Sequence, residues 1–440
     1  MNYSEKKYKI FPLNLQNIEF NFFLLGVLFL ASAPFISCLI FIYPAYKGLL
    51  DLKININKDS NTQVFLIVSI ILILKSIFSI FNVNNQIGSW TYSLNWAGIT
   101  NWIPLFIFSI GLNKYLNDSY KRKLVSKFLI IGTIPVLISC VGQYWFKWYG
   151  PFEILNGLIT WFQKPLSDNN QNVTGLFSNP NYSGLWLTMM WPLSIAIMKE
   201  KIHFKEFLKS KIMFIIVILI TSFTILTNSR NAWIGLFISI PIFLGKKSLR
   251  WYLPLILTIV FVILASFLPF IPKEIKDISE ALIPENIGNK FSEIILNFDT
   301  FPRIDIWSNA IQFILQKPLF GWGADSFPIL YNLKTGIWNN HTHNLFLELS
   351  VSYGIIVASL IYFVYIKTLI RSYNNIFMKR SSTSICDRGW WIAFLIFFLS
   401  HLYDVLIFDI RINLASWIFL IGLKNIIINP SENYSSNSLN

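Results

Sequence analysis

Charged residues and cysteines are scarce in this chain of 440 residues. Only 13% of the residues are Asp, Glu, Lys or Arg, whereas 54% are hydrophobic and the mean hydropathy is +0.53. This balance excludes an ordinary water-soluble domain. The three cysteines, Cys38, Cys140 and Cys386, are isolated in or beside apolar segments and form no CxxC pair. They therefore predict neither a disulfide framework nor a zinc site.

Long apolar runs take the place of the missing charge. Stretches long enough to cross a hydrocarbon core of about 30 Å recur along the whole chain, for example at 211–226 and 251–270. Backbone amides in lipid need internal partners, which helices supply, and the runs are continuous where a barrel strand would alternate. The chain is therefore predicted to be an all-α polytopic membrane protein.

The net charge of +14 does not indicate a nucleic-acid partner. Lys and Arg form short clusters between apolar runs, which is the pattern of the positive-inside rule. If every cluster lies in the cytoplasm, each interval between clusters contains an even number of crossings. The intervals then predict twelve membrane helices with both termini inside, near 13–31, 34–50, 63–81, 98–113, 124–145, 182–199, 212–228, 231–246, 251–270, 345–371, 389–407 and 411–428.

The two ends of the chain and the first helix pair need separate treatment. The N-terminus is basic, but no small-residue cleavage pattern follows its apolar run, so we interpret it as a retained anchor. The first pair is either two short helices that meet at Pro34 or a re-entrant hairpin. Residues 429–440 are polar and low in complexity, which predicts a disordered cytoplasmic tail.

Because the number of crossings between two cytoplasmic clusters is even, three segments lie at the outer face: the turn 227–233, the loop 146–181 and the large loop 271–344. A loop of that size between two spans is unusual, and long loops tend to be functional. Apolar residues within it recur at helical spacing between Pro302 and Pro318. This spacing predicts an amphipathic helix that lies along the membrane surface.

The segment NNHTHN, at 339–344, holds two of the four histidines of the chain. A metal site would need further ligands, but His203 is assigned to the cytoplasmic side and His401 to the interior of a span. The alternative is a general base. Asn344 is a good N-cap for the apolar run that follows, so His343 would lie just outside a helix N-terminus, where the dipole favours neutral imidazole. A simple polar cap is the third interpretation.

Two arginines lie in the other outer segments. Arg230 stands at the outer end of a short helical hairpin, where it either reaches lipid headgroups or offers a guanidinium to a phosphate. Arg303 opens the predicted amphipathic helix, and it either pairs with Asp299 or Asp305 at the interface or serves the same phosphate.

Further polar residues are candidates for support of the site. Lys75 lies inside an apolar span and must face protein, water or the interface. Asp404, Asp409 and Arg411 gather at the turn between the last two spans, as a self-neutralising structural cluster or as part of the site. Asn181 lies in an Asn/Pro-rich segment that is either a plain turn or a lip that contacts sugar.

The motifs TNSRNAW, PRIDIWSNAIQFILQKPLFGWG and HTHNLFLELSVSYGI, in this order and with this spacing, resemble those of the superfamily of O-antigen ligases and Wzy-type O-antigen polymerases. The resemblance covers about 175–370 as a ligase/polymerase core that includes the loop 271–344. Residues 1–174 then form N-terminal membrane helices, and residues 371–428 form C-terminal ones.

The resemblance implies a bacterial inner-membrane glycosyltransferase with a GT-C-like architecture and its active site in the periplasm. Such enzymes take a glycan from undecaprenyl diphosphate and transfer it to lipid A core, to a growing polysaccharide or to a protein hydroxyl, without metal, cofactor or obligate protein partner. Family members rely on two arginines and a histidine, which match Arg230, Arg303 and His343 here. Direct attack at the anomeric carbon would invert its configuration.

The same resemblance and the outer placement suggest which residues contact the substrates. The expected substrate-binding residues are His341, Asn344, Asn181, Trp307 and Arg411. Trp307 could stack on a sugar, although tryptophan is equally expected at a membrane interface. A secondary transporter of a small anion such as bicarbonate is the alternative function. Carriers, however, usually place ionisable residues at the midplane on broken helices, and the polar residues here collect at one face.

Overall fold

The computed structural model describes residues 18–51, 59–81, 93–167, 171–203, 206–245, 248–267, 271–283, 302–378 and 384–428. These residues are mostly helical. The first half contains α1 (Ile18–Phe29), α2 (Pro34–Leu50), α3 (Ser60–Phe81), α4 (Ser93–Thr100), α5 (Ile103–Gly111), a 3₁₀ turn (Asn113–Leu116), α6 (Ser119–Trp145), α7 (Pro180–His203) and α8 (Phe207–Leu226). The second half contains α9 (Arg230–Leu244), α10 (Leu249–Phe267), α11 (Lys273–Leu282), α13 (Pro302–Gln316), α14 (Phe327–Thr335), α15 (Leu345–Tyr353), α16 (Ile355–Tyr373) with a π turn at Asn374–Met378, α17 (Ile385–Ser400) and α18 (Ile410–Ile428).

Every predicted membrane segment contains a helix, which confirms the helical membrane class. Among the residues that the structure describes, five helices are long and apolar enough to cross a membrane: Ser60–Ile80, Ser119–Trp145, Phe207–Leu226, Ile355–Met378 and Ile410–Ile428. Shorter apolar helices include α1, α2 and α9. The first pair consists of two short helices, with Pro34 at the start of the second, where its missing N–H costs no hydrogen bond. The predicted tail 429–440 and much of the predicted loop 271–344 lie outside the described residues.

Three predicted spans have different boundaries. The span at 98–113 is broken at Asn101 and Trp102 into α4 and α5, and the span at 345–371 is broken at Gly354 into α15 and α16. The predicted helix 389–407 ends at Ser400, so His401 caps α17 and does not lie inside a span. The placement of His401 in a span interior was therefore wrong.

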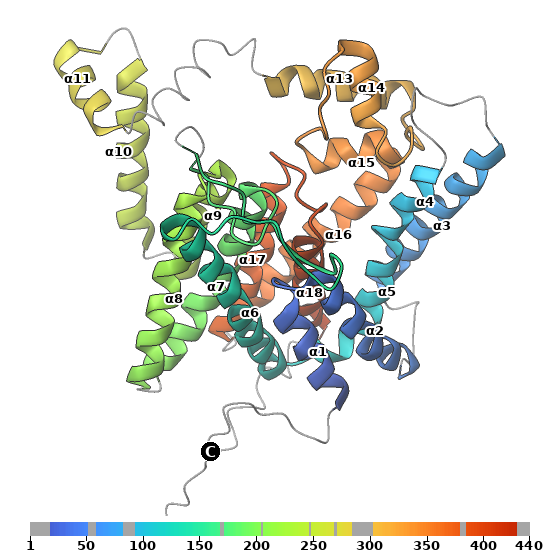
Figure 1. Cartoon of the computed structure of the whole chain (residues 1–440), viewed down its shortest axis with the longest axis horizontal. Coiled ribbons are helices and arrows are strands. Elements are labelled where there is room, and N and C mark those ends of the chain that lie inside the picture. The colour runs from blue at the N-terminus through green and yellow to red at the C-terminus, as the bar shows by residue number, and fades with distance from the viewer. Residues whose placement is uncertain are drawn as a thin grey trace, which may run out of the picture.

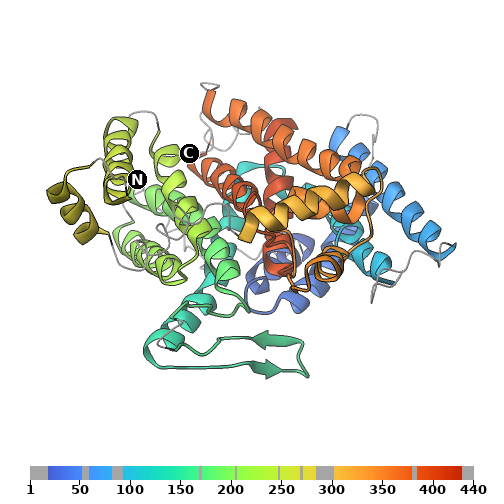
Figure 2. The same cartoon turned by 90° about the horizontal axis from the view of Figure 1, so that it is seen from above.

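The loop 146–181 adds a feature that an all-α prediction omits. Strand β1 (Phe152–Ile154) pairs antiparallel with β2 (Ile159–Trp161), with Glu153 opposite Thr160. The tip of this hairpin has positive φ at Leu155, Asn156 and Gly157. Figure 2 shows the hairpin extending sideways from the helical bundle.

Helix α7 is the centre of the bundle and packs against α6, α8, α9 and α17. Its apolar side chains are buried on all sides, among them Trp186, Met189 and Leu193. Small residues allow close contacts here: a Cβ on Gly184 would lie 2.9 Å from the Cβ atoms of Ala232 and Ser229. The turn between α8 and α9 is therefore held directly against α7.

The two ends of the bundle differ in character. Ion pairs connect the basic clusters at one end: Lys123 pairs with Glu200, and the buried Arg122 binds Asp387 at 2.7 Å. Helices α13, α14 and α15 gather at the opposite end (Figure 1), around a small core that includes Phe313 and Phe327.

Lys75 shows how this second end is attached to the bundle. Its ammonium, on α3, donates to the carbonyl oxygens of Phe320 and Ser352. The lysine therefore faces protein, which is one of the three alternatives that the sequence left open. It joins α3 to the segment between α13 and α14 and to the last turn of α15.

Candidate active site

The HTHN segment is fixed by its own hydrogen bonds and by those of the helix that follows it. Asn344 is the N-cap of α15, as predicted, and its side-chain oxygen accepts from the N–H of Leu347 at 3.0 Å. Glu348, on the first turn of α15, reaches back and accepts from the N–H of Thr342 at 2.9 Å. From α13, the indole of Trp307 donates to the carbonyl of Thr342 at 2.9 Å. The segment is thus tied to two helices.

His343 has a left-handed backbone, with φ of +53°. A residue with a Cβ adopts this region at a cost of about 1–2 kcal/mol, and such strain is common at functional sites. The N–H of His343 donates to Nδ1 of His341 at 3.2 Å, and the two rings meet edge to face with centroids 4.3 Å apart. The strained backbone therefore places both imidazoles on the same side of the segment.

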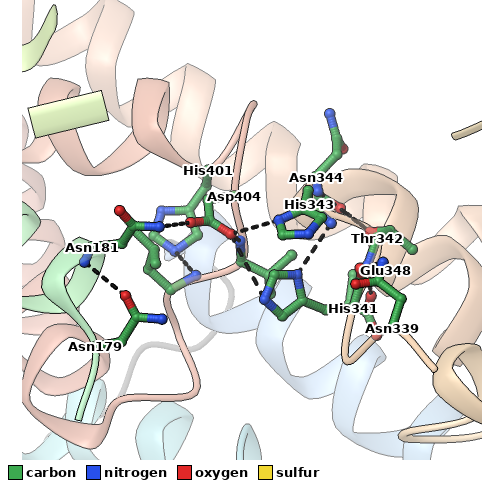
Figure 3. Close-up of polar contacts among 12 residues, drawn as sticks. Asn179, Asn181, Asn339, His341, Thr342, His343, Asn344, Glu348, His401 and Asp404 are labelled. Atoms are coloured by element: carbon green, nitrogen blue, oxygen red, sulfur yellow. Dashed lines mark hydrogen bonds and ion pairs between the residues drawn. The ribbon is translucent and has the colours of Figure 1, made fainter. Parts of the chain in front are cut away.

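Asp404 is the residue toward which both imidazoles point. Nδ1 of His343 lies 3.1 Å from its Oδ1, and Nε2 of His341 lies 3.7 Å from the same oxygen (Figure 3). The other carboxylate oxygen accepts from the amide of Asn181 at 3.0 Å. Burial raises the pKa of Asp404, but the hydrogen bonds and charges of the histidines and the N–H of Val405 outweigh burial and hold this pKa below its usual range. Asp404 is therefore a buried carboxylate that stays ionised.

The turn that carries Asp404 is joined to the HTHN segment by one backbone hydrogen bond and by one from a side-chain amide. The N–H of Leu345 donates to the carbonyl of His401 at 2.9 Å, and the amide of Asn344 donates to the carbonyl of Leu402 at 3.0 Å. His401 in turn accepts from the N–H of Leu406 at 3.2 Å. His401 thus shapes the turn, and the histidine pair and Asp404 form one rigid unit.

These contacts assign the protons on both rings. An ionised carboxylate only accepts, so Nδ1 of His343 carries the proton that points to Asp404, and Nε2 of His343 keeps its lone pair. Because Nδ1 of His341 accepts from a backbone N–H, the proton of its neutral ring is on Nε2. Burial lowers the pKa of His341 to about 4, against the opposing charge of Asp404, so this ring is neutral near pH 7.

Arg303 lies close to this unit, and Arg230 lies close to Arg303. Burial lowers the pKa of Arg303; the charge of Asp404 acts against this effect and that of Arg230 adds to it, so Arg303 lies near both charges. Arg303 is half-buried on the first turn of α13, and Arg230 is exposed at the first residue of α9. Asp305 is occupied by the hydroxyl of Tyr331 at 2.6 Å, and within the described ranges it forms no ion pair with Arg303.

The turn before Arg230 is built to a fixed shape. Asn228 has φ of +53°, and its amide donates to Asn172 at 2.9 Å. The hydroxyl of Thr227 accepts from the N–H of Ser229, and the indole of Trp233 donates to the carbonyl of Ile225 at 3.1 Å. Arg230 therefore begins its helix from a constrained turn.

A metal ion has three potential ligands here, whereas the sequence interpretation found none beyond the two histidines. One donor atom each of His341, His343 and Asp404 lies within 4.8 Å of the others, so the expectation that no third ligand lies nearby was wrong. The hydrogen bonds nevertheless oppose a metal. Ligation through Nε2 of His341 requires the proton on Nδ1, where it would meet the N–H of His343. The geometry suits proton transfer better.

The remaining predicted residues occupy supporting positions. Asn344 uses its side chain to cap α15, Trp307 holds the carbonyl of Thr342, and Asn181 holds Asp404. Arg411 is 5% exposed, pairs with Asp409 at 3.0 Å and covers the ring of Phe177, so its contacts favour the structural alternative.

Asp404 is the main site residue that the sequence interpretation did not select. It was grouped with Asp409 and Arg411, either as one self-neutralising cluster or as part of the site, and only the last two pair with each other.

Comparisons with known proteins agree with the sequence motifs. Residues 215–362 match the family model described as O-antigen ligase, and this segment contains Arg230, Arg303 and His343. The chain is also 24% identical over 285 residues to the ComP-specific O-oligosaccharyltransferase of Acinetobacter baylyi, across 62% of this chain and 47% of that protein. It thus spans about half the length of this relative. The predicted resemblance to the O-antigen ligase superfamily is confirmed.

Proposed function

We propose that this chain, with its O-antigen ligase segment, is a membrane glycosyltransferase that moves a glycan from a polyprenyl-diphosphate carrier to an acceptor hydroxyl. The observation that carries this proposal is the His343–Asp404 pair beside two arginines. The pair supplies a proton acceptor, and the arginines supply positive charge for a diphosphate. These are the two groups that such a transfer requires.

The base in this proposal is Nε2 of His343. Its lone pair accepts the proton of the acceptor hydroxyl as the oxygen attacks the anomeric carbon, and the positive charge that develops on the imidazole is stabilised by Asp404. Asp404 touches neither substrate, so it acts as a positioning residue that fixes the tautomer and orientation of the ring. General base catalysis of this kind contributes about 10²–10⁴-fold to rate.

Arg230 and Arg303 stabilise the departing diphosphate. The bond from the anomeric carbon to the diphosphate oxygen breaks, and its electron pair stays on the diphosphate, where guanidinium groups spread the charge. Attack from the face opposite the leaving group inverts the anomeric carbon. All of these groups come from the protein, so the proposed reaction uses neither metal nor cofactor.

The membrane arrangement belongs to the same proposal. Twelve helices cross the bacterial inner membrane with both termini in the cytoplasm, and the site opens at the periplasmic face. The separation of the basic clusters from the HTHN end supports this orientation. A transporter has less support, because carriers usually place their ionisable residues at the midplane, and the histidine pair, Asp404 and Arg303 lie at one end of the bundle.

Acceptor and glycan are defined only by class. The name of the Acinetobacter relative describes the transfer of an oligosaccharide to oxygen with specificity for ComP. It supports an oligosaccharide donor and an O-linked product for this chain. The proposed acceptor is a hydroxyl of lipid A core or of a growing polysaccharide.

The test is a transfer assay with purified protein, a lipid-linked glycan and an acceptor. His343→Ala is expected to lower kcat at least 100-fold while the thermal unfolding midpoint stays within a few degrees. Asn340→Ala serves as a matched control, because Asn340 is an exposed neighbour in the same segment and its side chain accepts from the indole of Trp338 at 2.8 Å. Wild-type turnover by His343→Ala would disprove the assignment of the base, and uptake of an anion into proteoliposomes without any donor would favour a transporter.

A further inference from the structure

A cavity of about 350 Å³ lies between α4 and α15, next to the HTHN segment. Its walls include Gly98 of α4, Trp102 between α4 and α5, Tyr353 of α15, and the side chains of Asp325, Phe408 and Asn413. Its volume falls within the range of small-molecule sites in proteins, about 300–1,000 Å³. No step proposed above uses it.

The cavity shares two walls with the active site. Glu348 lines the cavity and also holds the N–H of Thr342, between the two histidines. Phe408 lines the cavity and lies with its ring 6.4 Å from the ring of His341. A ligand in the cavity would therefore lie next to the HTHN segment that carries the proposed base.

Two carboxylates face this space without a cation. Glu348 is 4% exposed and bonds to Thr342, and Asp325 lies close enough for its charge to act on Glu348. Within the part of the chain that the structure describes, neither forms an ion pair, and Asp325 has no hydrogen-bond partner. Burial raises the pKa of Asp325. Asp325 is an exposed residue, so its carboxylate is accessible to hydrogen-bond donors of a ligand, and Glu348 is buried with one oxygen bound to the N–H of Thr342.

The charges of the site and of the cavity indicate which part of a substrate each one binds. Arg230 and Arg303 offer positive charge to the diphosphate, whereas the carboxylate of Asp325 would repel it. The cavity therefore suits a part of a substrate that carries hydroxyl groups and no negative charge.

The remaining walls suit a sugar ring. Phe408 is 50% exposed, and its ring can cover the C–H face of a saccharide. The side-chain oxygen of Asn413 accepts from the indole of Trp417 at 3.1 Å, so its N–H groups can donate to a sugar oxygen. The cavity thus combines carboxyl groups that can accept from hydroxyls, an amide that can donate to a sugar oxygen, and an aromatic ring that can cover a sugar face.

We propose that this cavity binds a saccharide ring through hydrogen bonds from its hydroxyl groups to Asp325 and Glu348. The identity of this ring as part of a substrate rests on the proposed function. It belongs either to the donor glycan or to the acceptor, and kinetics separate the two. Binding itself does not depend on transfer.

Binding is measured by saturation-transfer difference NMR on full-length protein in nanodiscs. The probes are free glucose, galactose, N-acetylglucosamine and N-acetylgalactosamine, with disaccharides of each. Asp325→Asn is the main variant because asparagine tolerates the left-handed backbone, φ +57°, of this residue. We expect it to lower the sugar signal at least fivefold. Asp277→Asn, an exposed carboxylate on α11, and His343→Ala are expected to keep the wild-type signal.

A second variant and a measurement of Ca²⁺ binding provide further tests of the sugar site. Glu348→Gln keeps the bond to the N–H of Thr342 and is expected to weaken binding as Asp325→Asn does. Equal sugar signals in wild type and Asp325→Asn, or no signal with any probe, would overturn the inference. Binding of Ca²⁺ at millimolar concentration without sugar binding would overturn it as well, in favour of a cation site.

Transfer kinetics separate this inference from the proposed function. We expect Asp325→Asn to raise KM for only one substrate about tenfold, and that substrate carries the ring. Sugar binding that needs Asp325, in a protein that transfers no glycan, would leave the cavity assignment standing and refute the proposed function. Normal transfer by Asp325→Asn with unchanged KM values would do the reverse.

Discussion

At the scale of single residues, the site depends on which ring nitrogen of each histidine already forms a hydrogen bond within the protein. His341 accepts a backbone N–H through Nδ1, and His343 turns Nδ1 toward Asp404. Only His343 is left with a lone pair that no described residue occupies. The Asn cap predicted from the sequence selects the same histidine for a different reason, the helix dipole. Two independent physical arguments therefore point to one base.

The two arginines give the first residue-scale prediction. Arg230→Lys and Arg303→Lys keep a positive charge but lose the planar pair of donors that fits a diphosphate. We expect each to lower kcat/KM for the lipid-linked donor about tenfold or more, with little change in KM for the acceptor. Steady-state transfer kinetics give both values. If Arg230→Lys has wild-type kinetics, Arg230 reaches lipid headgroups instead.

His341 gives a prediction about pH and stability. Its folded pKa of about 4 lies below the ordinary value of 6.5 because of burial. Between these values the unfolded chain binds a proton that the folded chain does not, so stability falls as pH falls from 6.5 toward 4, by up to about 3 kcal/mol. The His341→Gln variant should lose this part of the pH dependence. Thermal unfolding midpoints at pH 7.5 and 5 measure the difference, and equal slopes for both proteins would contradict the prediction.

At the scale of elements, apolar runs predicted which segments are helical but not where they break. Gly354 interrupts what the sequence presents as one apolar helix, because a backbone contact with another segment requires it. A Cβ at this position would lie 2.0 Å from the carbonyl oxygen of Leu319. Asp404 was missed for a related reason: its partner is 61 residues away in the chain, and only tertiary packing brings the two together.

The break between α15 and α16 can be tested with a matched pair of glycines. Gly354 has φ +91° and ψ +161°, and Gly245 has nearly the same backbone, φ +85° and ψ +177°, with open space around it. We expect Gly354→Ala to cost at least about 2 kcal/mol more than Gly245→Ala, because only Gly354 meets a neighbouring backbone. Thermal unfolding of both variants tests this. Equal losses would show that backbone strain alone explains the glycine.

At the scale of the whole molecule, the positive-inside rule and the packing agree on two ends of different character. The sequence predicted that the basic clusters lie together, and ion pairs between α6, α7 and α17 join three of them. The sequence did not predict the β-hairpin, since three-residue strands inside a loop leave little periodic signal.

The orientation can be tested by cysteine labelling. Asn156→Cys at the hairpin tip should react with a membrane-impermeant maleimide on intact spheroplasts, whereas Lys209→Cys should react only after permeabilisation. Both positions are exposed, and Cys140 and Cys386 are buried, so Cys38→Ser gives a quiet background. Labelling of Lys209→Cys on intact spheroplasts would contradict the orientation.

The central claim is that His343 and Asp404 act as one unit in glycan transfer. A double-mutant cycle of kcat, from His343→Ala, Asp404→Asn and the double variant, tests it most directly. We predict that His343→Ala lowers kcat at least 100-fold, that Asp404→Asn lowers it at least tenfold, and that the double variant is no slower than His343→Ala. Penalties that multiply in the double variant would contradict the account.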